Sequence, residues 1–187
     1  YFGSYRGVNG FDAHRPHHLG VFAQSYPANK TKPPVGKLVP FHLDTAHTNA
    51  MCTNDLDHGW PSQHRYWNGG RNDSFVTVHE QVDGAPFGTI TMGYFTRADL
   101  PFHYALADAF TICDQYHCSV FGPTYPNRLY SMSGTIDPDG HAGGPVVTNP
   151  STPYVYSWET MPERLQDAGI SWKVYSQADT NNNVLPY

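Results

Sequence analysis

Apolar positions spaced three and four residues apart predict five short helices in this chain. The clearest is residues 100–110, where Phe102, Leu106 and Phe110 fall on one side and Asp99 stands in the capping position. The expected helices span residues 61–67, 74–81, 100–110, 126–132 and 158–168, with Ser157 capping the last and Gly69, Gly134 and Gly169 in stop positions.

Runs rich in β-branched and aromatic residues predict a few short strands. The best candidate is the Ser-Trp-Lys-Val-Tyr run of residues 171–175, which follows a predicted helix and Gly169. Helix, glycine and strand in this order form half of an α/β unit. Further strands are expected at residues 38–43, 111–113 and 119–121. The pattern indicates an α/β layered fold whose sheet still lacks strands.

Composition makes this α/β fold rich in loops. The 187 residues include 17 glycines and 16 prolines, and only 39% are hydrophobic. Residues 1–50 are expected to be mostly loop and residues 51–187 to hold the core of a single domain. The three cysteines, Cys52, Cys113 and Cys118, are an odd number, so at least one thiol is free or pairs elsewhere.

The charge argues against nucleic acid as a partner, and the hydropathy argues against a transmembrane segment. The net charge is −5 and no basic run is present, which argues against nucleic acid as the main partner. No run of 18 apolar residues occurs, so the sequence predicts no transmembrane segment. Few lysines and many tyrosines, asparagines and glycines are typical of a secreted, periplasmic or cell-surface protein.

The sharpest chemical signal is the segment Gly122–Arg128, in which a strand-like run meets Gly-Pro, a hydroxyl residue and then a predicted helix. Thr124 stands at or just before the helix start, where amides and the helix dipole favour a phosphate and an ionised alkoxide. Asn127 and Arg128 lie one turn further on and can hydrogen-bond phosphoryl oxygens. The alternative is that Thr124 is an ordinary helix cap.

His58 could take part in the same phosphate chemistry, and the histidines and the aromatic residues as groups raise two alternative functions. His58 can act on a phosphate as donor or general acid, while His64 suits a surface position on a helix. The 11 histidines raise the alternative of a zinc hydrolase, although groups such as His14, His17 and His18 match no zinc motif. The many tyrosines and tryptophans raise that of a secreted binding module without catalysis.

In combination, several segments resemble the bacterial phosphoesterase family of phosphatidylcholine-preferring phospholipases C and related acid phosphatases. They are Asp57-His58-Gly59-Trp60, Gln63-His64, Trp67-Asn68-Gly69-Gly70, residues 92–104, residues 113–119, Gly122-Pro123-Thr124-Tyr125-Pro126-Asn127-Arg128-Leu129-Tyr130 and residues 171–175. The resemblance implies an alkaline-phosphatase-like three-layer fold with a mostly parallel central sheet.

The resemblance also implies a chemistry. Thr124 corresponds to a metal-bound nucleophile that attacks a phospholipid or a smaller phosphoester, and His58 to a phosphate-contacting residue. Asn127 and Arg128 match the motif as substrate-binding residues. The activity expected is phospholipase C, or alternatively that of an acid phosphatase. The lipid headgroup, the identity of the divalent metal and the oligomeric state stay open.

Two segments that the family uses to bind the metal do not occur in these residues. One is a Glu-Asn segment expected directly before Tyr1, and the other is an Asp-Glu-x-Asp-Gly segment expected beyond Tyr187. A divalent cation needs several oxygen ligands, and Thr124 supplies one. The chain is therefore expected to be a fragment of a longer protein and to be inactive by itself.

Overall fold

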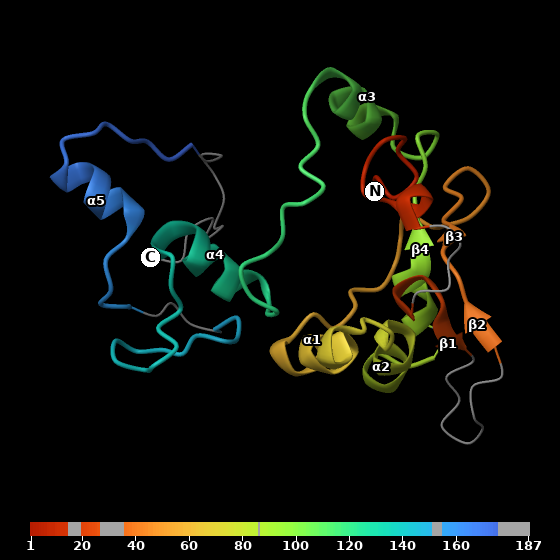
Figure 1. Cartoon of the computed structure of the whole chain (residues 1–187), viewed down its shortest axis with the longest axis horizontal. Helices are drawn as coiled ribbons and strands as arrows, with labels where there is room; N and C mark the ends of the chain where they lie inside the picture. Colours follow the sequence, from red (N-terminus) through yellow and green to blue (C-terminus); the bar gives the residue numbers. More distant parts are fainter. Residues whose placement is uncertain (15–19, 27–35, 86, 151–154, 176–187) are drawn as a thin grey trace. The chain divides into compact units, whose positions relative to one another are not determined.

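The computed structural model describes residues 1–14, 20–26, 36–85, 87–150 and 155–175 (Figure 1). The chain divides into two compact units. Unit 1 comprises Tyr1–Asp57 and Pro61–His117, and unit 2 comprises His58–Trp60 and Cys118–Tyr187. Both are built from short helices and long loops, with small sheets in unit 1. The mixed α/β character is confirmed at this coarse level.

Unit 1 holds most of the regular structure. Its helices and strands are the 3₁₀ turns η1 (Phe11–His14), η2 (Gly20–Phe22), η3 (Asn68–Gly70) and η4 (Phe87–Met92), the helices α1 (Trp60–Trp67), α2 (Phe75–Val82) and α3 (Pro101–Ala109), and the strands β1 (Gln24–Tyr26), β2 (Gly36–Leu38), β3 (Phe41–His42) and β4 (Gly93–Tyr94). The predicted helices at residues 61–67, 74–81 and 100–110 are thus confirmed to within one residue at each end.

The strand predicted at residues 38–43 is wrong as a single element. Residues 36–38 form β2, which pairs antiparallel with β1, while Phe41 and His42 form β3, which pairs parallel with β4. Pro40 lies between β2 and β3 and has no N–H to donate to a ladder, which explains the break. Both sheets have two strands, so the layered central sheet is not formed by the described residues.

The core of unit 1 lies where α2 packs against η4 and β1 (Figure 1). Val76 and Val78 of α2 are buried, as are Met92, Leu100 and Tyr104. The contact between α2 and η4 is close, because a Cβ added to Gly88 would lie 2.6 Å from the carbonyl oxygen of Val76.

Unit 2 contains the helices α4 (Thr124–Ser133) and α5 (Met161–Asp167). Leu129 of α4, Ile136 and Val146 form its buried core, and Tyr125, Tyr130, Val147, Tyr156 and Trp158 pack around them. Gly134 and Gly169 take the left-handed conformation after α4 and α5, with φ of 72° and 68°. The predicted glycine stops are therefore confirmed.

Several local predictions in the two units are wrong. Residues 111–113, 119–121 and 171–175 are irregular, because no neighbouring strand among the described residues offers them a ladder. The residue capping α3 is Leu100 instead of Asp99, and α5 starts after Thr160 instead of Ser157.

All three cysteines are exposed free thiols. Within the described ranges, no helix is both long and apolar enough to cross a membrane.

Candidate active site

The site predicted from the sequence is centred on Thr124, which the structure places at the first residue of α4. Its side chain is exposed. The residue that caps the helix is Pro123, in an extended conformation with φ −68° and ψ −174°. The alternative that Thr124 serves as the cap of this helix is therefore wrong.

The role of a cap is taken by a side chain from another segment. The backbone N–H of Tyr125 donates a 2.8 Å hydrogen bond to Oδ1 of Asn149. Pro126, the next residue, has no N–H. Two of the positions that normally need capping at the start of α4 are therefore accounted for without the hydroxyl of Thr124. No hydrogen bond to that hydroxyl occurs among the described residues.

Asn127 holds the loop of residues 120–123, which leads into the helix. Its Nδ2 donates to the carbonyl oxygens of Val120, Gly122 and Pro123, each at 3.1 Å. Its Oδ1 accepts from the N–H of Val120 at 3.2 Å. The carboxamide is therefore fully engaged with backbone, and its predicted contact with substrate stays a prediction.

The loop of residues 120–123 also packs against an aromatic ring. Gly122 is buried, and a Cβ added to it would lie 3.0 Å from Cε3 and 3.3 Å from Cζ3 of Trp60. Because Trp60 packs here, residues 58–60 belong to the same unit as Thr124. The structure therefore brings His58 into the unit of the predicted nucleophile, as an exposed residue in the irregular stretch before α1.

Arg128 lies four residues after Thr124 on α4 and is exposed. Side chains four residues apart share one face of a helix. Its guanidinium therefore starts from the face that carries the hydroxyl of Thr124. The structure leaves its predicted contact with phosphoryl oxygens as a prediction.

A divalent metal at Thr124 would need ligands beyond its single oxygen. Within the described ranges, no group of three or more His, Cys, Asp or Glu side chains is arranged to hold a metal ion. The described residues thus do not make up a metal site by themselves. His17 and His18 lie outside those ranges, and the metal predicted at Thr124 stays a prediction.

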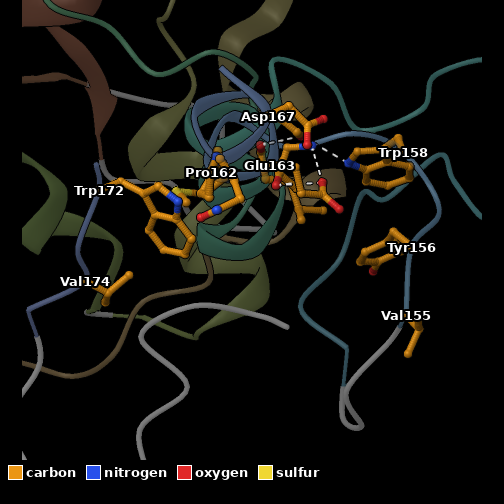
Figure 2. Close-up of a pocket in the computed structure, with 13 residues that line it drawn as sticks. Val155, Tyr156, Trp158, Pro162, Glu163, Asp167, Trp172 and Val174 are labelled. Carbon is orange, nitrogen blue, oxygen red and sulfur yellow. Dashed lines mark hydrogen bonds between the residues drawn. The ribbon is translucent and has the colours of Figure 1, made fainter. Parts of the chain in front are cut away.

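A cavity of about 810 Å³ lies in the same unit, between α4, α5 and the segments around them (Figure 2). Tyr156 and Trp158 stack with their ring centroids 4.5 Å apart, and the indole N–H of Trp158 donates to Ser133 at 3.1 Å. The described lining residues include the carboxylates Glu163 and Asp167 and no lysine or arginine. This lining suits an apolar group better than a phosphate.

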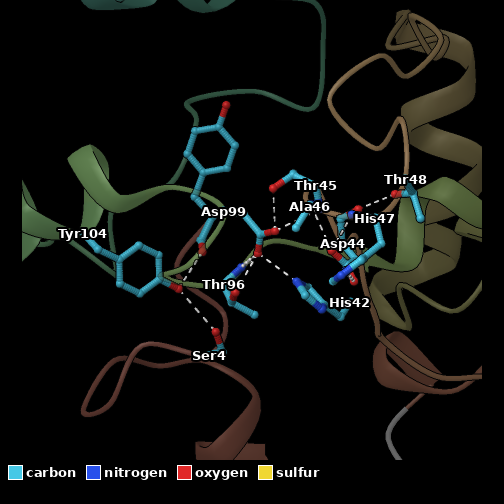
Figure 3. Close-up of polar contacts among 11 residues, drawn as sticks. Ser4, His42, Asp44, Thr45, Ala46, His47, Thr48, Thr96, Asp99 and Tyr104 are labelled. Atoms are coloured by element: carbon cyan, nitrogen blue, oxygen red, sulfur yellow. Dashed lines mark hydrogen bonds and ion pairs between the residues drawn. The ribbon is translucent and has the colours of Figure 1, made fainter.

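The densest polar network was missed by sequence reasoning and lies in unit 1 around Asp99 (Figure 3). The carboxylate is 3% exposed and accepts from the N–H and hydroxyl of Thr96 at 2.7 and 2.6 Å. It also accepts from the N–H and hydroxyl of Thr45 at 3.1 and 2.9 Å, and Nε2 of His42 lies at 2.8 Å. These hydrogen bonds, those from Thr96 first, hold the pKa of Asp99 far below its ordinary value.

This network joins two segments that are distant in sequence. It ties β3 and the turn after it to the turn before α3, and the carboxylate fixes the orientation of the His42 ring. Next to it, Asp44 accepts from the N–H groups of Ala46 and His47 at 3.0 and 3.1 Å. The only sequence signal was an aspartate before Leu-Pro, which is the usual sign of a cap and gave no hint of His42.

Comparison with known proteins shows to which family the chain belongs. The Phosphoesterase family matches residues 1–187. Phospholipase C B of Mycobacterium tuberculosis is 46% identical over 200 residues, covering 100% of this chain and 38% of that protein. Non-hemolytic phospholipase C of Burkholderia pseudomallei is 44% identical over 184 residues, covering 96% of this chain and 24% of that protein. The chain thus spans well under half the length of these relatives, and with the family match over all its residues it belongs to the Phosphoesterase family.

Proposed function

We propose that the protein carrying this chain is a phosphoric-ester hydrolase of the phospholipase C type, with Thr124 as its nucleophile. The observation that carries this proposal is the exposed hydroxyl at the first residue of α4, which takes no part in capping the helix. The relatives named phospholipase C favour a phospholipid phosphodiester over a phosphomonoester as the substrate.

The proposed reaction has two steps. Oγ1 of Thr124 attacks phosphorus, the bond from phosphorus to the oxygen of diacylglycerol breaks, and that alcohol leaves with a proton. Water then attacks the phosphothreonine, which releases the phosphorylated headgroup and restores the hydroxyl. A threonine hydroxyl needs a base or a divalent metal to become a nucleophile. We expect further ligands of such a metal in the parts of the protein outside this chain.

The surroundings of Thr124 suit the charge that develops on the phosphoryl oxygens. The start of α4 carries a partial positive charge from its aligned peptide dipoles. Arg128 lies one turn along the same face and can offer a planar pair of donors. His58, in the same unit, is proposed as a further phosphate contact.

The wider architecture follows from the family. We propose that residues 1–187 are part of one catalytic domain with an alkaline-phosphatase-like three-layer fold, whose central sheet is completed by strands outside this chain. Segments such as residues 171–175, irregular here, would then pair with those strands. We also propose that the protein acts outside the cytoplasm, where a phospholipid surface is accessible to it.

The test is substitution of Thr124 in the full-length protein. Thr124→Ala is expected to lower phosphodiester turnover at least ~10³-fold, and Thr124→Ser, which keeps a hydroxyl, is expected to stay within ~10²-fold of the original. Thr111→Ala, at an exposed threonine of unit 1, serves as the matched control and should change turnover little.

Mass spectrometry of acid-quenched reactions should find the phosphoryl group on Thr124. Near-normal turnover by Thr124→Ala would refute the nucleophile. Turnover without any covalent adduct would support a zinc-type hydrolase with direct attack by water. Faster hydrolysis of monoesters than of diesters would place the protein with the acid phosphatases of the family. Binding of vesicles without hydrolysis would support the remaining alternative, a secreted binding module without catalysis.

A further inference from the structure

We propose that Asn127 is a positioning residue that sets the direction of the Thr124 hydroxyl by holding the 120–123 loop. This inference rests on the proposed function of Thr124 and deepens it. It gives Asn127 a role different from the contact with phosphoryl oxygens that its place in the motif suggests.

The hydrogen-bonding capacity of the Asn127 side chain is used up by the loop. An asparagine carboxamide has two N–H donors and one acceptor oxygen. In this structure Nδ2 of Asn127 faces three carbonyl oxygens at 3.1 Å, and Oδ1 accepts from the N–H of Val120 at 3.2 Å. Both donors and the acceptor are thus engaged, and binding a phosphoryl oxygen would require releasing the loop.

The amide of Asn127 reaches Pro123, the residue before the proposed nucleophile. Helical side chains point toward the N-terminus of their helix, so Asn127 points from the first turn of α4 back at the incoming chain. One of its acceptors is the carbonyl oxygen of Pro123. That carbonyl belongs to the planar peptide group whose nitrogen is that of Thr124. Fixing this oxygen therefore fixes the plane from which the backbone of Thr124 departs.

The loop of residues 120–123 is held by contacts of two kinds. Among the described residues, the N–H of Gly122 donates within the loop, to the carbonyl of Val120 at 2.9 Å, and Pro123 has no N–H. The ring of Trp60 packs against Gly122, and the amide of Asn127 forms hydrogen bonds with Val120, Gly122 and Pro123. Van der Waals contact with a ring resists approach but does not orient a carbonyl group. Asn127 therefore supplies a directional restraint on the carbonyl groups of this loop.

A nucleophile held this way reacts from a fixed geometry, and small misplacements are costly to rate. A shift of about 1 Å at a reacting group can lower the rate ~10²-fold. Loss of the Asn127 amide should accordingly lower kcat and leave substrate affinity largely unchanged. A residue that bound the substrate equally in the ground state and the transition state would mainly raise KM.

The experiment uses the full-length protein with Asn127→Ala and Asn127→Asp and a soluble chromogenic phosphodiester. We expect Asn127→Ala to lower kcat by ~10²-fold while KM changes less than about threefold. In Asn127→Asp an ionised carboxylate faces three carbonyl oxygens, whereas a protonated one regains an O–H donor. The kcat of Asn127→Asp relative to the original protein should therefore rise as the pH is lowered through the range in which that carboxyl is protonated. Asn127→Ala should show no such recovery.

The matched control is Gln24→Ala in unit 1. The Gln24 amide is fully buried and also faces three backbone carbonyls, those of Gly20, Val21 and Asn72. Its loss should lower the melting temperature at least as much as Asn127→Ala does, while kcat stays within about twofold. This comparison distinguishes a loss of kcat caused by lower stability from a loss of kcat caused by displacement of Thr124.

The outcomes separate the two proposals. If Asn127→Ala keeps kcat while Thr124→Ala is inactive, the positioning role is wrong and the nucleophile stands. A rise in KM at constant kcat would return Asn127 to direct substrate contact and also overturn the role. Near-normal activity of Thr124→Ala would overturn the proposed function itself. If Asn127→Ala does not fold, Asn127→Ser, which keeps one donor, is measured instead, with the same division between kcat and KM deciding.

Discussion

Substitution of Gly122 by alanine tests how tightly the loop before Thr124 is held. The new Cβ would lie 3.0 Å from Cε3 of Trp60 and 3.3 Å from Cζ3. Both separations are shorter than ordinary van der Waals contact, so the loop or the ring must move by a few tenths of an ångström. Since Gly122 is buried, this overpacking should lower the free energy of unfolding by about 1–3 kcal/mol.

The same movement should affect catalysis in the full-length protein. The carbonyl of Gly122 is one of the oxygens that accept from Asn127, so displacing the loop also disturbs the restraint on Thr124. A shift of about 1 Å can lower a rate ~10²-fold, so a displacement of a few tenths of an ångström should lower kcat by about 3- to 10-fold. The assay is steady-state turnover of a soluble phosphodiester at saturation, with the melting temperature measured on the same preparations.

Gly134→Ala is the matched control, because it alters the opposite end of α4. Gly134 has φ of 72° and no atom within 4 Å of an added Cβ. Alanine there costs about 1–2 kcal/mol of backbone strain without steric contact and without reaching the 120–123 loop. Turnover by Gly122→Ala within twofold of the original would refute the reasoning. So would equal losses of kcat in both variants, which would trace the effect to stability alone.

Three further predictions concern stability of the full-length protein and are read by urea denaturation. Leu129→Ala, in the core of unit 2, should lower the free energy of unfolding by about 3 kcal/mol, whereas Leu106→Ala, which is 42% exposed, should cost less than about 1 kcal/mol. Thr160→Ala removes a donor to Glu163 at the start of α5 and should cost about 1 kcal/mol. The pKa of Asp99 is lowered by its hydrogen bonds, so its contribution to stability is complete above the ordinary value of 3.8 and falls as pH drops below it. Asp99→Asn should flatten this acid dependence, and an unchanged slope between pH 5 and pH 2.5 would contradict it.

The helices could be predicted from sequence because their signals are local. Apolar spacing predicted α2 and α3, the latter with a proline in its first turn, and a first-turn proline with a glycine after the last turn predicted α1 and α4. The start of α5 was misplaced because Ser157 and Thr160 are both good capping residues. The structure selects Thr160, whose N–H and hydroxyl both donate to Glu163 three residues later.

The strands could not be predicted because pairing depends on residues far away in the chain. β3 consists of only Phe41 and His42, and it exists because Gly93 and Tyr94 lie beside it. Conversely, residues 171–175 have strong strand-forming side chains but no partner strand among the described residues. The hydrogen bonds of Asp99 could not be predicted for the same reason, since its partners Thr45 and His42 lie more than 50 residues earlier.

At the candidate site the motif predicted where Thr124 lies, but not which neighbouring residues cap the helix and hold the loop. The sequence shows a threonine at a helix start, and a threonine there normally caps the helix. In the structure Asn149 accepts the N–H of Tyr125 and Asn127 binds the loop, so neither structural role is left to the hydroxyl. Replacing Thr124 should therefore alter stability little, in contrast to Asn127. A hydroxyl that is exposed and without a structural role at the positive end of a helix suits the proposed attack on a phosphate ester, once a base or a divalent metal activates it.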